Sequence, residues 1–106
     1  MWLFTKTGFF SAVQNWDDSN LIHVRARFQG DLERLCKKYD VPANVVSLPD
    51  TDYPYRMDFE RKRWSEIVKR EALEIDYANF KNAVHDGTER DSAYMGVWST
   101  MRRFQK

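Results

Sequence analysis

Three basic side chains alternate with apolar ones near the end of the first quarter of the chain. His23, Arg25 and Arg27 occupy every second position between Leu21 and Phe28, and apolar residues stand between them. A period of two is that of a β-strand with one buried face, so the basic groups should share the other face. Guanidinium and imidazole groups placed there can donate charge-assisted hydrogen bonds to a carboxylate or a phosphate.

Arg56 extends this face if its own strand lies nearby. It belongs to a second alternating segment, Tyr53 to Phe59, in which Tyr53, Tyr55, Met57 and Phe59 form the apolar set. The plainer alternative is a solvated sheet face whose cations pair with Asp58 and with glutamates. The sequence favours that alternative slightly, because alternating charge is ordinary on an exposed sheet face.

Arg61 and Arg63 stand at the start of a predicted helix, where the helix dipole disfavours cations by about 0.3–1 kcal/mol each. An external anionic partner would explain their position. Pairing along the helix, of Lys62 with Glu66 and of Glu66 with Arg70, explains it equally well. Both interpretations stay open.

Trp16 lies in the polar turn cluster Asn15 to Asn20, outside any periodic apolar pattern. It either folds back onto the sheet or stays exposed as an apolar anchor for a partner. The first alternative is favoured, because tryptophan is rarely left in water.

Residues for catalysis and metal binding are sparse. Cys36 falls on the apolar stripe of a predicted helix and is expected to be buried and inert. Ser11 and His23 suggest at most a weak Ser–His pair, and His85 stands far from His23 without metal-ligand spacing. Phosphate-binding glycine loops are absent from the sequence. We therefore expect no catalytic residue, no metal site and no cofactor.

The elements that position these residues follow from periodicity and turn residues. A hairpin is predicted from Trp2–Thr5 and Phe9–Gln14, joined by a type I turn with Gly8 in the left-handed region. A third strand (21–28), a helix from Gly30–Asp31 to about Tyr39, and a short apolar run (45–48) follow. Pro54 places the 53–59 strand at an edge or delays its start. A long helical stretch (60–84), with a kink or break near Asp76, precedes a last helix carrying an apolar stripe, namely Tyr94, Val97, Trp98, Met101 and Phe104.

These elements predict an α+β fold, with an antiparallel sheet of about five strands and helices packed on one face. The order is roughly β-β-β-α-β-β-α-α. A length of 106 residues suits a single domain, residues 1–106. The 17 basic and 16 acidic residues give a net charge of +1, which argues against a DNA-wrapping protein. One cysteine, no signal-peptide pattern and no long apolar run favour a cytoplasmic location.

Several short motifs resemble those of a group of small bacterial proteins. They are the opening W-L-F-T-K-T-G-F-F-S, then V-R-A-R, D-L-E-R-L, D-Y-P-Y-R, I-D-Y-A-N-F-K and V-W-S-T-M. The group consists of uncharacterised proteins of about 100 residues, so the resemblance implies a bacterial protein of similar length. It brings no activity and no site residue with it.

The sequence thus leads to a small, non-enzymatic binding or regulatory domain. Its binding residues are His23, Arg25, Arg27, Arg56, Arg61, Arg63 and Trp16. We expect the anionic partner to be a protein with an acidic surface, because the net charge is near zero. A single-stranded nucleic acid, bound by arginines and stacked aromatics, is the alternative, followed by a small anion in a sensor or an enzyme.

Overall fold

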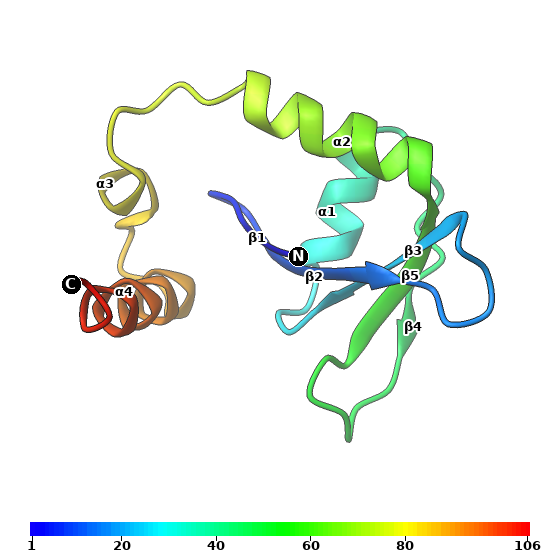
Figure 1. The fold of residues 1–106 in the computed structure, drawn as a ribbon, viewed down its shortest axis with the longest axis horizontal. Coiled ribbons are helices and arrows are strands. Elements are labelled where there is room, and N and C mark those ends of the chain that lie inside the picture. The colour runs from blue at the N-terminus through cyan, green and yellow to red at the C-terminus, as the bar shows by residue number, and fades with distance from the viewer. The chain divides into compact units, whose positions relative to one another are not determined.

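A five-stranded antiparallel sheet organises residues 1–75. The computed structural model describes the whole of residues 1–106 and divides into two compact units, Met1–Ile75 and Asp76–Lys106. The strands are β1 (Trp2–Phe4), β2 (Phe9–Gln14), β3 (Leu21–Ala26), β4 (Val46–Ser47) and β5 (Tyr55–Glu60). Their order in the sheet is β1-β2-β3-β5-β4, and all neighbours are antiparallel (Figure 1). The predicted α+β class and element order are confirmed. That the units fold as a single domain stays a prediction.

One face of this sheet carries the core. The alternating apolar side chains of β2, β3 and β5 lie there, namely Phe10, Ala12, Ile22, Val24, Ala26, Met57 and Phe59. Helices α1 (Asp31–Lys38) and α2 (Arg61–Leu73) lie on the same side of the sheet (Figure 1). Trp64 of α2 packs its ring against Phe59 at 5.5 Å and Phe10 at 6.4 Å between centroids. Burial of this face accounts for the cohesion of the unit.

The first hairpin forms as predicted, but its turn works differently. Gly8 does not have a positive φ, so the left-handed position assigned to it is wrong. Space requires the glycine instead, because a Cβ at this position would lie 2.5 Å from the Phe10 ring. The Thr5 hydroxyl closes the turn by accepting the Gly8 N–H at 3.0 Å. The glycines that do have a positive φ are Gly30 (φ 86°), which precedes α1, and Gly87 (φ 76°).

Pro54 delays the start of β5. The strand begins at Tyr55, because Pro54 has no N–H for the ladder, and it lies between β3 and β4 rather than at an edge. Tyr53 therefore lies outside the strand. Its ring is close to Phe9, at 6.5 Å between centroids, and Phe9 belongs to the sheet face opposite the core.

The predicted helical stretch from 60 to 84 is broken. Helix α2 ends at Leu73, and α3 (Phe80–Val84) begins after Asn79, whose side chain accepts the Asn82 N–H at 3.0 Å. The predicted break near Asp76 is confirmed.

The second unit consists of α3 and α4 (Glu89–Arg102). Thr88 caps α4 by accepting the Asp91 N–H at 3.4 Å, and Tyr94 stacks on Phe80 at 5.8 Å. The predicted last helix is confirmed, but Tyr94 alone of its apolar stripe is buried. Neither α4 nor any other helix is both long enough and apolar enough to span a membrane.

Candidate functional site

The sheet face opposite the core gathers four of the predicted binding residues. In the register of β3 and β5, His23 stands opposite Asp58 and Arg25 stands opposite Arg56. Arg27 follows β3 on the same face, by the alternation of a strand. We call the surface formed by His23, Arg25, Arg27, Arg56 and Tyr53 the arginine face. Two arginines directly opposite each other repel, so this pairing needs an opposing stabilisation.

Tyr53 supplies that stabilisation from the centre of the face. The guanidinium carbon of Arg25 lies 4.6 Å from the centroid of the Tyr53 ring, and that of Arg27 lies 4.2 Å away. Both distances fall within the range of cation–π attraction. Arg56 approaches the same residue by its backbone, because its Nε donates to the Tyr53 carbonyl at 2.9 Å. With an exposed fraction of 5%, Tyr53 is a fixed support for three cations.

The three guanidinium groups hydrogen-bond only to neutral acceptors. Arg25 donates to the Ser11 hydroxyl at 2.8 Å, and Arg27 donates to the Asp52 carbonyl at 2.9 Å. The Nε of Arg25 is buried and has no hydrogen-bond partner. None of the three groups forms a salt bridge with a carboxylate. Their positive charge is therefore uncompensated by any direct contact.

The alternative, in which the basic groups already have acidic partners, is met at one end of the face only. The Nδ1 of His23 lies 2.9 Å from Asp58, which also accepts from the Asn15 side chain at 3.1 Å. Asp58 is thereby engaged with His23 and not with an arginine. The face thus has a paired end at His23 and an unpaired, cationic end around Tyr53.

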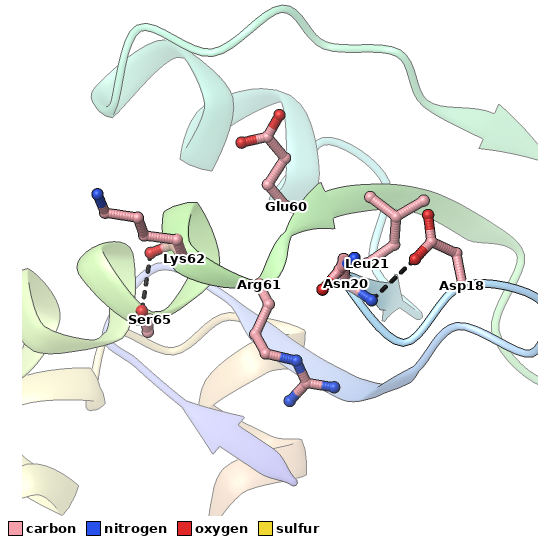
Figure 2. A pocket seen from close by; sticks show the side chains of 7 residues that line it. All are labelled: Asp18, Asn20, Leu21, Glu60, Arg61, Lys62 and Ser65. Carbon is pink, nitrogen blue, oxygen red and sulfur yellow. Dashed lines mark hydrogen bonds between the residues drawn. The ribbon is translucent and has the colours of Figure 1, made fainter.

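Arg61 lies apart from the arginine face. Its guanidinium donates to the Ser19 carbonyl at 2.9 Å and to the Gln14 side chain at 2.7 Å. It lines an open hollow of about 630 Å³ at the start of α2 (Figure 2), together with Asp18, Asn20, Leu21, Glu60, Lys62 and Ser65. Glu60, Arg61 and Lys62 leave the helix start in different directions, so carboxylates and cations line the hollow together.

Arg63 points in yet another direction, toward α1. Its Nη2 donates to the Tyr39 carbonyl, and its Nη1 lies 3.4 Å from the Glu66 carboxylate. The predicted pairing of Lys62 with Glu66 and of Glu66 with Arg70 is wrong, since Arg70 pairs with Glu74 at 3.4 Å. Arg63 therefore fastens two helices together.

Trp16 is 97% exposed, so the favoured expectation that it folds back onto the sheet is wrong. The turn around it explains why. The Asn15 side chain accepts the N–H groups of Asp17 (2.8 Å) and Asp18 (3.1 Å), which fixes a tight loop with Trp16 on its outside. The indole is thus left exposed to solvent, as the other alternative requires.

The remaining chemically reactive residues are engaged structurally. Burial, and secondarily the charge of Glu33, raises the pKa of the Cys36 thiol, which contacts the Met57 sulfur at 3.3 Å. The suggested Ser11–His23 pair is wrong, because Ser11 stands opposite Arg25 in the register. No three histidine, cysteine or acidic side chains converge as a metal site would need.

Comparison of the chain with protein-family models, with curated proteins and with solved structures finds no match in any of the three. The inference of function therefore depends on the chemistry of the arginine face.

Proposed function

We propose that the protein is a non-enzymatic binding domain whose arginine face recognises the acidic surface of a partner protein. The observation that carries the proposal is the set of three guanidinium groups around Tyr53, none of which contacts a carboxylate. A guanidinium has five N–H donors, and each of these three uses one of them on a neutral acceptor. Donors therefore remain for an incoming anion.

Preorganisation strengthens this face as a binding surface. An arginine that is free in solution loses side-chain entropy on binding, at a cost of about 0.5–1.5 kcal/mol for each immobilised side chain. Arg25 and Arg27 are already held against the Tyr53 ring, and Arg56 is held by the Tyr53 carbonyl. A carboxylate would thus meet cations whose positions are set before binding, and the planar fork of arginine suits it.

A protein fits the face better than a nucleic acid does. The Tyr53 ring itself is buried and contacts two guanidinium groups, so it leaves no open surface on which a base could stack. Trp16 supports the same preference, because exposed tryptophans are frequent anchors in protein interfaces.

The proposal is tested with a fluorescently labelled decaglutamate peptide, with binding followed by anisotropy. Arg27→Ala and Arg56→Ala should each weaken binding about tenfold, the loss expected for one charge-assisted contact. The matched control is Lys37→Ala, which removes an exposed cation from α1 that makes no ion pair. Equal affinities of the Arg27 and Lys37 variants would refute the proposal.

A decathymidylate of the same length distinguishes the nucleic-acid alternative. Tighter binding of this probe than of the peptide, with a steep decrease as salt rises, would replace the proposed partner class. The melting temperatures of all variants are measured in parallel, so that a loss of folding is not taken for a loss of binding.

A further inference from the structure

A row of cross-strand partners runs from one edge of the sheet to the other, on the face opposite the core. The register pairs Trp2 with Ser11, Ser11 with Arg25, Arg25 with Arg56, and Arg56 with Val46. Residues that are paired in this way share one face of a sheet. We call these five residues the transverse row. Helices α1 and α2 lie on the core side of the sheet, so neither of them covers the row (Figure 1).

Both ends of the transverse row are apolar and exposed. Trp2 is 66% exposed, and Val46 is 54% exposed. The Trp2 ring stands nearly perpendicular to the ring of Phe9, with 6.1 Å between centroids and an interplanar angle of 85°. This edge-to-face arrangement is favourable for aromatic rings, and Phe9 is itself buried. The indole is therefore supported from one side while most of Trp2 stays open to a partner.

The middle of the transverse row is cationic. Arg25 donates to the Ser11 hydroxyl at 2.8 Å, so its guanidinium extends to β2, the strand next to β1. Arg56 stands directly opposite Arg25, and neither forms a salt bridge with a carboxylate. A spacing of about 4.8 Å between strands places Arg25 about 10 Å from Trp2 and Arg56 about 5 Å from Val46. Over about 19 Å, the row is thus apolar, then cationic, then apolar again.

We infer that the transverse row binds a segment of the partner protein in which two acidic side chains stand between two apolar ones. The inference rests on the proposed function of the arginine face and specifies the sequence that this face selects. Carboxylates match the two arginines, and apolar side chains match Trp2 and Val46 at the ends. In an extended chain, side chains on one side recur about every 6.6 Å, so four of them span about 20 Å. A heptapeptide with apolar residues at its two ends and acidic residues at its third and fifth positions therefore fits the row.

The order of the transverse row favours a protein segment over a single-stranded nucleic acid. A nucleic acid carries a phosphate at every nucleotide, so cations along the whole of its path would suit it. The row has its cations in the middle only. Val46, at the end beyond Arg56, offers no ring on which a base could stack.

Two labelled heptapeptides of identical composition test the inference. The first is Leu-Ser-Glu-Ser-Glu-Ser-Leu, and the second, Glu-Ser-Leu-Ser-Leu-Ser-Glu, exchanges the acidic and apolar positions. Binding is followed by fluorescence anisotropy, and the first should bind at least about tenfold more tightly. Equal affinities would overturn the inference and leave the proposed function standing. Decaglutamate binding that is insensitive to loss of Arg27 and Arg56 would refute the proposed function instead.

Variants at the two ends of the row give the second test. Trp2→Ser should weaken binding of the first heptapeptide about tenfold, and Val46→Ser about threefold, because valine buries less apolar surface. Both should change decaglutamate binding by less than about twofold, since that peptide has no apolar side chain. The matched control is Leu73→Ser, which removes an apolar side chain that is 70% exposed at the end of α2 and should change neither.

Two results with these variants would contradict the inference. One is unchanged binding of the first heptapeptide by a Trp2→Ser protein that is folded by circular dichroism. The other is tighter binding of decathymidylate than of this heptapeptide, lost in the Trp2→Ser protein, which would assign the indole to base stacking.

Discussion

Replacement of Tyr53 by leucine should destabilise the protein by an amount that its contacts define. The change keeps an apolar side chain but removes the ring beneath the Arg25 and Arg27 guanidinium groups. Each cation–π contact contributes about 0.5–1 kcal/mol at a partly exposed site. The tilted ring contact with Phe9, at 6.5 Å, adds about 0.5–1.5 kcal/mol. The expected loss in the free energy of unfolding is therefore about 1.5–3.5 kcal/mol.

Urea unfolding followed by tryptophan fluorescence measures this loss, because the chain has four tryptophans. The matched control is Tyr53→Phe, which keeps the ring and both guanidinium contacts and should change stability by less than about 0.5 kcal/mol. Equal stability of the leucine variant and the natural chain would show that the ring does not hold the arginines. So would a phenylalanine variant that is destabilised as much as the leucine variant.

Three further predictions concern two buried side chains, Asp31 and Cys36, and the half-buried Tyr39. Asp31→Ala should lower the free energy of unfolding in urea by about 1–3 kcal/mol, because the buried Asp31 carboxylate accepts the Phe9 N–H at 3.1 Å. Asp31→Asn keeps an acceptor oxygen and should lower it less. Cys36 should react with a thiol reagent far more slowly in the native protein than in denaturant, since it is buried and its thiol pKa is raised; equal rates would contradict its burial. Burial and the hydrogen bond to Glu71 raise the pKa of Tyr39 to about 12. The contribution of the protonated Tyr39 hydroxyl to stability is therefore present below about pH 10 and is lost as pH rises from about 10 to 12. Tyr39→Phe should lack that part of the alkaline loss in urea unfolding, and an unchanged pH profile would exclude the mechanism.

The sheet could be predicted from the sequence because its signals are local. The alternation around His23 and Arg25 fixes which side chains share a face, and burial of the intervening apolar residues enforces it. Pro54 predicts the late start of β5, because it has no N–H to donate to the sheet. The alternation nevertheless predicts the wrong face for Tyr53, because the strand does not continue through Pro54.

The divergence of Arg61 and Arg63 follows from helix geometry. Successive helical residues turn by about 100°, so side chains two positions apart point to nearly opposite sides. One donates to Ser19 and Gln14, and the other donates to Tyr39. Residue type and the helix dipole, which led to the prediction of both arginines as binding residues, do not contain this difference in direction.

Trp16 and Ser11 depend on details that no periodic pattern contains. The outward position of Trp16 results from hydrogen bonds of the Asn15 side chain within one turn. The position of Ser11 opposite Arg25 results from the register of β2 and β3, which depends on the geometry of the turn between them.

The most direct test of the arginine face is nuclear magnetic resonance of its guanidinium groups. Uniformly labelled protein is titrated with decaglutamate while the Nε–H signals of Arg27 and Arg56 are followed. The largest shifts should fall on these two signals, and they should saturate together with the shifts of the neighbouring β5 amides. Shifts confined to Arg61, Arg63 and the start of α2, with the Arg27 and Arg56 signals unmoved, would contradict the proposal.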